Sequence, residues 1–355
     1  MMEKRPLFSI ILPFHNGENT LSTAVCSVLE QTFSDYELLL VDDASEDQGL
    51  LLAERLAGEN ERLRVISLDP NVGAARARDA GVREAAGEFL MFLDADDAYE
   101  KDLLAQVAAS LTRHPADAVV WGLQEDTLDA EDRLVDRKVI TVPAAELDTR
   151  EQVRQVVLTL EEKSLYGYFW NKAYRTSVWR ALNTPIPVQP FNEDIQFNLI
   201  FFQDLSSLNL LPTAPIHYHL RAGTSLTHRF LPDYYPVAMG RVSGLLAQQQ
   251  SWGQDTPEVR RIIGGIWLRY LASALERNTD RRMGLGRRDR RQFLEEVYES
   301  ELYRALLPWV CPGERGMRLL AFCLKRRWSG PCLLAGRVLH WVKANLPGLF
   351  RRAKG

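Results

Sequence analysis

Three aspartates, Asp94, Asp96 and Asp97, follow directly on the apolar run 89–93. Such a run predicts a buried strand, and the C-terminal ends of strands are where open α/β sheets bind ligands. Carboxylates this close together repel one another unless a cation lies between them, and hard oxygen ligands suit Mg²⁺ or Mn²⁺. The alternative is an acidic turn that caps the next helix, since Asp favours helix N-caps. The three residues alone leave both interpretations open.

The elements that would position these carboxylates alternate between strands and helices over the first 122 residues. Apolar runs predict strands at 8–12, 37–41, 63–68, 89–93 and 118–121. Helical spacing of apolar residues predicts helices at 21–29, 50–56, 74–86 and 103–111. This alternation indicates βαβ units, and therefore an α/β fold whose mostly parallel sheet has helices on both faces. Residues 123–150 are rich in charge and predict an extended or hairpin insertion.

A polar cluster follows each of the first four strands. The clusters are residues 13–16, 42–45, 71–73 and 94–97. Because the carboxyl ends of parallel strands meet at one edge of a sheet, we expect the four clusters to form one site. Singly, Asp43 or Asn71 would more often be a helix cap or a turn residue. Their shared position after four strands favours a ligand site.

These clusters resemble, in order, the motifs of family 2 glycosyltransferases. The matching segments are Pro-x-aromatic-Asn at 13–16, Val-Asp-Asp-x-Ser at 41–45, Asn-x-Gly-x-x-x-Ala-Arg-x-x-Gly at 71–81, Asp-x-Asp at 94–96 and a Glu-Asp pair at 193–194. The resemblance covers roughly residues 7–225. It implies a GT-A fold, a Rossmann-like architecture that binds a nucleotide-sugar and a divalent metal ion, Mn²⁺ or Mg²⁺.

The resemblance also implies how the donor binds. Asp43 would accept a hydrogen bond from the nucleobase, since a carboxylate suits the imide N–H of uracil. His15 stands where the family usually has Tyr and would stack on the base. Arg78 would present a cation to the diphosphate or the donor sugar, although a solvated helix face explains it equally well. Pro13, Asn16 and Glu18 complete the expected donor-binding residues.

Within the Asp-x-Asp motif, the resemblance implies that Asp94 contacts the ribose and Asp96 the metal ion. Asp97 or His219 are further candidate ligands. His217 and His219 lie two residues apart on an expected strand, and we expect them to face opposite sides of it, with only one at the site. The segment from His217 to Arg221, continued by Thr224 and Ser225, resembles the part of the family that closes over the diphosphate.

The Glu-Asp pair opens an amphipathic segment at 193–201. In the family the second acid is the general base, so the resemblance implies that Asp194 deprotonates the acceptor hydroxyl as this attacks the anomeric carbon, with inversion. Capping is the alternative, because a helix N-terminus favours carboxylates. Trp170, Lys172 and Glu193 are the expected acceptor-side residues.

Composition limits the class of protein. The chain has 355 residues, 46% of them hydrophobic, and a formal charge of −4, which argues against a nucleic-acid partner. Its four cysteines show no metal-ligand spacing with His and predict reduced thiols. The strand pattern begins within about eight residues, which leaves no room for a signal peptide, and no apolar run of about 18 residues predicts a transmembrane helix. We therefore expect a cytoplasmic protein.

We expect three segments: a GT-A nucleotide-sugar-binding and catalytic domain at 1–230, a helical region at 231–312 and a basic amphipathic tail at 313–355. The tail has ten Lys or Arg and one acidic residue. Its apolar helical face (Leu334, Val338, Trp341 and Val342) lies opposite a basic face (Arg337, His340 and Lys343). Such a helix binds the inner, anionic surface of a membrane, or packs on the core with a solvated basic face.

Processive members of the family carry Gln-x-x-Arg-Trp before membrane helices, and residues 324–328 lack the Gln. The resemblance thus implies an enzyme that transfers one sugar, from a UDP-sugar, to a hydroxyl of a glycan or lipid-linked acceptor in bacterial surface-polysaccharide synthesis. The alternative is a non-catalytic sugar-nucleotide-binding or scaffold subunit with the same fold. A nucleotidyltransferase would need a Gly-rich, Lys-containing loop after the first strand, and residues 13–16 are not one.

Overall fold

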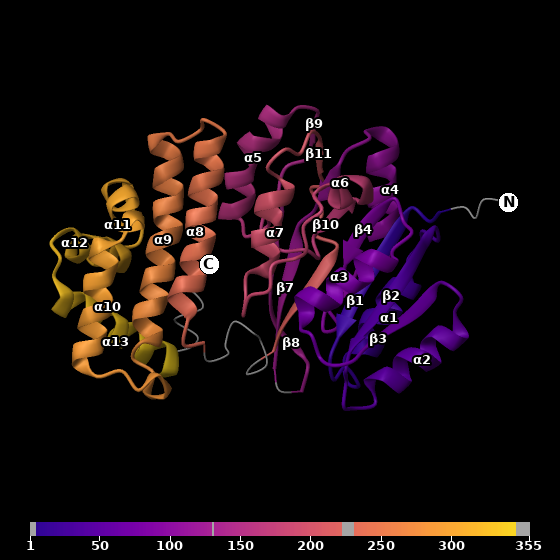
Figure 1. Cartoon of the computed structure of the whole chain (residues 1–355), viewed down its shortest axis with the longest axis horizontal. Coiled ribbons are helices and arrows are strands. Elements are labelled where there is room, and N and C mark those ends of the chain that lie inside the picture. Colours follow the sequence, from indigo (N-terminus) through magenta and orange to yellow (C-terminus); the bar gives the residue numbers. More distant parts are fainter. Residues whose placement is uncertain (1–4, 130, 222–230, 346–355) are drawn as a thin grey trace. The chain divides into compact units, whose positions relative to one another are not determined.

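The computed structural model describes residues 5–129, 131–221 and 231–345 (Figure 1). The chain divides into two compact units, Met1–Arg229 and Phe230–Gly355. The first unit contains the α/β elements, and the second is helical.

The main sheet of the first unit has the strand order β3-β2-β1-β4-β10-β6-β11-β9. Its bounds are β1 Phe8–Phe14, β2 Tyr36–Asp43, β3 Leu63–Leu68, β4 Phe89–Phe92, β6 Ala118–Val120, β9 Ala145–Leu147, β10 Lys172–Arg175 and β11 Leu208–Leu210. The first four are parallel, whereas β10 is antiparallel to both β4 and β6. Every residue of β1 is buried, so both faces of the sheet are covered there.

The helices of this unit flank the sheet (Figure 1). They are α1 Leu21–Leu29, α2 Gly49–Glu59, α3 Ala74–Glu84, α4 Leu103–Arg113, α5 Arg150–Glu162, α6 Thr176–Ala181 and α7 Glu193–Phe201. All nine elements predicted before residue 122 are present, with small differences at their ends. Both β1 and β2 run two residues further than predicted, because their ladder continues through the pairs Pro13–Val41 and Phe14–Asp42. Part of each of the first two polar clusters, 13–16 and 42–45, therefore lies inside its strand.

A second sheet has the order β5-β12-β7-β8, from β5 Ala98–Tyr99, β12 Ile216–Arg221, β7 Leu123–Leu128 and β8 Leu134–Ile140. The strands β7 and β8 form an antiparallel hairpin, as predicted for the charged insertion. β12 pairs with β5, which begins directly after Asp97. This pairing carries the residues of β12 to the aspartate cluster, although they lie about 120 positions further along the chain.

The second unit consists of α8 Tyr234–Ser251, α9 Pro257–Arg277, α10 Arg287–Glu299, α11 Glu301–Leu306, α12 Arg315–Lys325 and α13 Ser329–Asn345, with single 3-10 turns at Arg281–Met283 and Leu307–Trp309. α9 is its central helix and contacts both α8 and α13. Thr256 caps α9 by accepting the Val259 N–H, and Pro257 occupies its first turn. Over the described residues, no helix has the length and apolarity that crossing a bilayer would require.

Close packing of α3 on β1 sets the position of the site loops, and Gly81 permits it. A Cβ at Gly81 would lie 2.5 Å from Ile11 Cγ2 and 3.2 Å from Val41 Cγ2. Gly58 in α2 offers a matched contrast, because a Cβ there would meet nothing within 4 Å.

Replacing Gly81 by Ala is expected to destabilise the protein by about 1–3 kcal/mol, since it overpacks a tight core contact. Gly58→Ala should leave stability unchanged or raise it by up to about 1 kcal/mol, because Ala is the better helix former. The midpoints of urea unfolding measure both effects. Equal midpoints for the two variants would contradict the packing argument.

Candidate active site

The loops after β1, β2 and β3 meet around Asp43, which is buried at the end of β2. Its carboxylate accepts the backbone N–H groups of Val72 at 2.7 Å and Gly73 at 2.8 Å. Its carbonyl oxygen accepts the Asn71 side-chain amide at 2.8 Å and lies 2.9 Å from His15 Nδ1. Gly73 has φ 83°, a conformation that favours glycine. Asp43 thus organises the 71–73 loop and brings it beside the exposed imidazole of His15.

Asn16 and Glu18 connect the loop after β1 to the loop after β2. The Asn16 backbone N–H donates to Ser45 Oγ at 2.9 Å, and its side-chain oxygen accepts the Glu46 N–H at 2.8 Å. Glu18 accepts the Gln48 N–H at 3.3 Å. Both residues are exposed, whereas Pro13 is buried within β1. Asn16 and Glu18 therefore form part of the accessible rim, and Pro13 supports it from inside the strand.

The aspartate cluster contains one exposed and one fully buried carboxylate. Asp96 is at the surface, but neighbouring atoms remove part of its hydration, and this desolvation, together with the charge of Asp94, raises its pKa. Asp97 is 1% exposed; its Oδ1 accepts the His219 N–H at 2.9 Å, and its Oδ2 has no hydrogen-bond partner among the described residues. Burial, followed by the charges of Asp96 and Asp94, raises the pKa of Asp97 well above its usual range.

Of the two histidines on β12, His219 is the one at the cluster. Its Nδ1 lies 2.7 Å from the Asp96 carbonyl oxygen. His217 is instead held by Asp126 and Glu100, each at 2.8 Å. The expectation that the two rings face opposite sides is wrong: they lie 6.2 Å apart and are inclined by 16°, because residues two apart on a strand share a face.

Arg78 connects the aspartate cluster to the Glu-Asp pair. It is only 8% exposed, and its guanidinium donates to Asp94 at 2.7 Å and to Glu193 at 3.1 Å. Burial lowers the pKa of Arg78, but the charges of Asp94 and Glu193 outweigh it and raise the pKa above its ordinary value. The interpretation as a solvated helix face is therefore wrong. The guanidinium is engaged by two carboxylates from motifs about 100 residues apart.

The Glu-Asp pair forms the first turn of α7. Asn192 precedes it with φ 68° and provides no side-chain cap. Asp194 Oδ1 accepts the Ile195 N–H at 2.8 Å. One of its oxygens therefore accepts a backbone N–H of the first turn, as expected if Asp194 caps the helix. The charge of Asp194 also acts on Arg78, which brings the expected base near the aspartate cluster.

Lys172, expected on the acceptor side, is fully buried behind the 165–171 loop. Its ammonium donates at 2.7 Å to three oxygens, the carbonyls of Leu165 and Tyr168 and the side chain of Asn171. An acceptor cannot reach it in this conformation. Lys172 instead fixes the loop that carries Tyr168 and Trp170.

That loop contributes to an aromatic stack that we did not predict. Trp170 stacks on Tyr168 with ring centroids 4.4 Å apart, and on Tyr218 of β12 at 5.3 Å. Burial raises the pKa of Tyr218, and the electrostatic interactions with Tyr168 and Asp97 raise it further. Because the charge of Asp97 acts on Tyr218, the stack lies close to the aspartates. Only the aromatic alternation at 166, 168 and 170 hints at it in the sequence. Thr224 and Ser225 lie outside the described residues.

The cluster fits a cation that binds together with a phosphate-bearing ligand. Across the described ranges, no three or more His, Cys, Asp or Glu side chains are arranged to hold a metal ion by themselves. Mg²⁺ at phosphate sites usually takes one or two carboxylates and completes its shell with phosphate and water. The exposed carboxylate of Asp96 and the unpartnered Oδ2 of Asp97 match that requirement.

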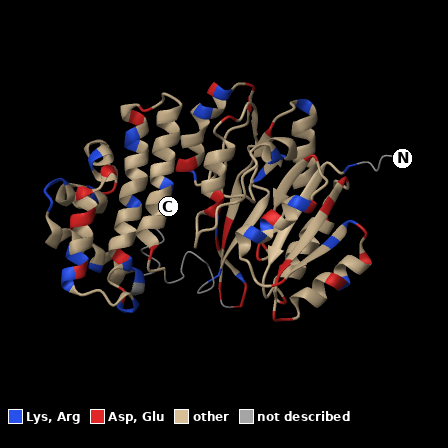
Figure 2. Ribbon diagram, in the orientation of Figure 1, with Lys and Arg blue, Asp and Glu red and all other residues tan. Residues whose placement is uncertain are grey.

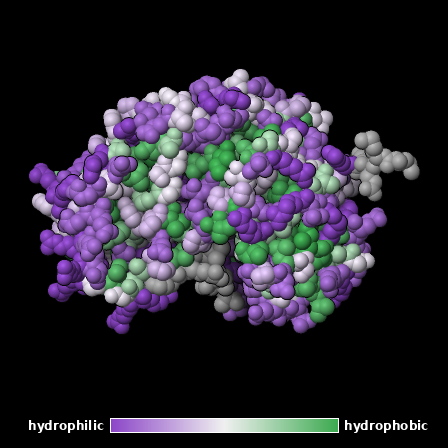
Figure 3. Space-filling view, viewed as in Figure 1, coloured by the Kyte–Doolittle hydropathy of each residue, from purple (hydrophilic) through white to green (hydrophobic). Residues whose placement is uncertain are grey.

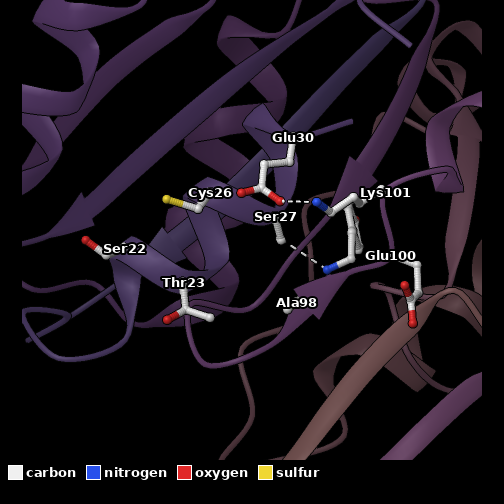
Figure 4. Close-up of a pocket in the computed structure, with 9 residues that line it drawn as sticks. Ser22, Thr23, Cys26, Ser27, Glu30, Ala98, Glu100 and Lys101 are labelled. Carbon is white, nitrogen blue, oxygen red and sulfur yellow. Dashed lines mark hydrogen bonds and ion pairs between the residues drawn. The ribbon is translucent and has the colours of Figure 1, made fainter. Parts of the chain in front are cut away.

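A separate hollow of about 460 Å³ lies between α1 and β5 (Figure 4). It is lined by Cys26 and Tyr99 among others, and Lys101 pairs with Glu30 at 3.0 Å across its edge. It contains none of the motif residues described above. The candidate active site is therefore the edge formed by the strand ends.

Three comparisons place this geometry among known proteins. The model of glycosyl transferase family 2 matches residues 9–178. The uncharacterized glycosyltransferase EpsJ of Bacillus subtilis is 28% identical over 210 residues, which are 58% of this chain and 59% of that protein. The chain thus matches less than two thirds of that relative's length.

Solved structures resemble nearly the whole chain. S. aureus TarS 1–349 in complex with UDP-GlcNAc has a TM-score of 0.63 at 21% identity, covering 95% of this chain and 91% of TarS 1–349. The mannosyltransferase PcManGT of Pyrobaculum calidifontis, in complex with GDP-Man and Mn²⁺, has a TM-score of 0.51 at 14% identity. The match covers 96% of this chain and 88% of PcManGT. At these identities the likeness shows the fold alone, which is GT-A followed by a helical region.

The raised pKa of Asp97 predicts that its ionised form destabilises the metal-free protein. The free carboxyl has a pKa of about 3.9, so this penalty grows as the pH rises from about 4 through the higher folded-state pKa. Asp97→Asn is therefore expected to raise the melting temperature near neutral pH by about 2–4 °C, and the gain should vanish near pH 4. Melting curves in a chelator test this, with the exposed Asp102→Asn as control. A variant that melts below wild type at neutral pH contradicts it.

Proposed function

We propose that the chain, whose residues 9–178 match the model of glycosyl transferase family 2, is an active, metal-dependent, inverting glycosyltransferase of that family. It transfers one sugar from a nucleotide-sugar, with a UDP-sugar as the favoured donor, to a hydroxyl of a glycan or lipid-linked acceptor in surface-polysaccharide synthesis. The observation that carries this proposal is the contact of Arg78 with both Asp94 and Glu193. That contact brings together the Asp-x-Asp cluster, proposed here to bind the donor, and the Glu-Asp pair, proposed here to face the acceptor.

The nucleoside part of the donor would bind at the rim formed by the first three loops. The exposed His15 ring is available to stack on the base. Both oxygens of Asp43 already accept backbone N–H groups, but each carboxylate oxygen has a second lone pair for a base N–H. Asp94 Oδ1 is engaged by Arg78, which leaves Oδ2 for the ribose. The UDP-GlcNAc complex of TarS, which has the same fold, supports a UDP-sugar as donor.

Asp96 and Asp97 would hold Mn²⁺ or Mg²⁺, with His219 beside them. When bound, such an ion supplies charge that stabilises the departing nucleoside diphosphate. The Mn²⁺ complex of PcManGT supports this assignment. Asp96 offers an exposed carboxylate just after β4, and the adjacent Asp97 offers Oδ2, which has no partner among the described residues.

On the acceptor side, Asp194 would take the proton from the attacking hydroxyl. The backbone N–H of Ile195 orients its carboxylate through Oδ1. Arg78 offsets the repulsion among Asp94, Glu193 and Asp194, whose charges all act on it. The stack of Tyr168, Trp170 and Tyr218 would form an apolar wall beside the site. Direct attack opposite the leaving group inverts the anomeric centre.

Asp96→Asn should abolish metal-dependent donor binding and leave the fold intact, because it removes a ligand charge at an accessible edge. Isothermal titration with UDP and Mn²⁺ measures this affinity. Asp102→Asn, also an exposed aspartate of the segment between β4 and α4, should bind as wild type does. Unchanged affinity in Asp96→Asn would remove the metal assignment.

Asp194→Asn should bind the donor normally but transfer sugar about 10²–10⁴-fold more slowly, the usual loss on removing a general base. Asp204→Asn, whose carboxylate is exposed just beyond α7, is the control and should keep full activity. Near wild-type transfer by Asp194→Asn would mean that the base lies elsewhere. Absence of both transfer and donor hydrolysis in the wild type, with donor binding intact, would favour the non-catalytic subunit.

A further inference from the structure

The last helix exposes an apolar stripe. On α13, Leu334, Val338 and Trp341 are each more than half exposed, and their spacing of four and three residues puts them on one helical face. The opposite face packs inward: Cys332 is buried, and a Cβ at Gly336 would collide with the carbonyl oxygen of Leu275 in α9. Packing on α9 therefore fixes which face of α13 points outward.

The preceding helix, α12, also exposes apolar side chains. Leu319 and Phe322 of α12 are exposed, whereas Leu320 and Leu324 are buried beneath them. Trp328, which directly precedes α13, is half exposed and meets the Phe322 ring edge to face at 5.7 Å. We call the six exposed side chains the outer surface: Leu319, Phe322, Trp328, Leu334, Val338 and Trp341.

Exposed cations accompany the outer surface and lack acidic partners. They are Arg315, Arg318, Lys325, Arg326 and Arg337, and none forms an ion pair with a described residue. Glu314 is the only acidic residue from Gly313 to the C-terminus. Lys and Arg are frequent on the outer helices of this unit (Figure 2), and its visible surface is mostly hydrophilic with small apolar areas (Figure 3).

Two residues of the basic face expected from the sequence do not belong to this surface. His340 Nδ1 lies 2.9 Å from Glu276 of α9, and Lys343 donates to the same carboxylate at 3.2 Å. They anchor α13 to α9. The tail thus combines both interpretations, because one face packs on the helical unit while the other stays exposed.

We propose that the outer surface binds the headgroup region of an anionic membrane leaflet. Exposed Trp, Phe and Leu side chains next to unpaired Lys and Arg suit an interface that is apolar below and negatively charged above. A lipid surface presents that combination over a broad area, which a small soluble anion does not. The proposal deepens the proposed function, since it would hold the enzyme near a lipid-linked acceptor, but its test does not require sugar transfer.

Flotation of the full-length protein with vesicles tests this. Vesicles of phosphatidylcholine with about one third phosphatidylglycerol should bind the protein at low salt, and high salt should weaken binding because it screens the cations. Pure phosphatidylcholine vesicles should bind it much less. The double variant Leu334→Gln with Trp341→Gln should bind anionic vesicles about tenfold or more weakly, and Arg318→Gln with Arg337→Gln should lose most of the salt dependence.

The control is Leu51→Gln with Val135→Gln, which replaces two similarly exposed apolar residues of the first unit. It should bind vesicles as wild type does. All variants should melt normally and keep their affinity for UDP with Mn²⁺, so failure of the membrane proposal is distinguishable from failure of the proposed function. The proposal would be overturned if the wild-type protein did not bind anionic vesicles at low salt, or if the control variant lost as much vesicle binding as the α13 variant. It would also be overturned if the wild type were a dimer and the α13 variant a monomer.

Discussion

The buried guanidinium of Arg78 is the interaction on which the arrangement of the site depends. It lies between Asp94, from the end of β4, and Glu193, from the start of α7, with the charge of Asp194 also acting on it. Removing one partner of a buried charge pair leaves the other uncompensated, at a cost of about 3–5 kcal/mol. The aspartate cluster and the Glu-Asp pair are therefore held together by one side chain.

Contacts elsewhere in the fold position Arg78 and its carboxylate partners. Arg78 lies one turn before Gly81, whose missing side chain lets α3 approach β1 and β2 closely. Asp43 fixes the loop that enters α3 through the N–H groups of Val72 and Gly73. On the other side, the pairing of β12 with β5 brings the His219 N–H to Asp97. Three aspartates at the end of β4 and the Glu-Asp pair of α7 thus lie around Arg78 or next to one another, and a bound cation would relieve this concentration of negative charge.

The strands and helices could be predicted because each depends on the order of apolar residues within its own segment. Apolar periodicity located the strands and helices up to residue 122, and the clusters after β1 to β4 do meet at one edge, since those strands are parallel. Contacts between distant residues were not predictable in this way. The sequence pattern left Arg78 open between a donor contact and a solvated helix face, and its burial between Asp94 and Glu193 depends on segments far away in the chain. Lys172, expected on the acceptor side, is buried as well, by the 165–171 loop that precedes it. The stack of Trp170 on Tyr218 and the pairing of His340 with Glu276 likewise depend on packing that no periodicity encodes.

In the proposed function, Asp96 and Asp97 hold a divalent cation where the donor diphosphate binds. Anomalous diffraction from a crystal of the wild-type protein grown with UDP and Mn²⁺ tests it most directly. We expect one strong manganese peak about 2 Å from a carboxylate oxygen of Asp96 or Asp97, with Arg78 still between Asp94 and Glu193. A diphosphate bound without a manganese peak at this cluster, or a peak at other residues, would contradict it.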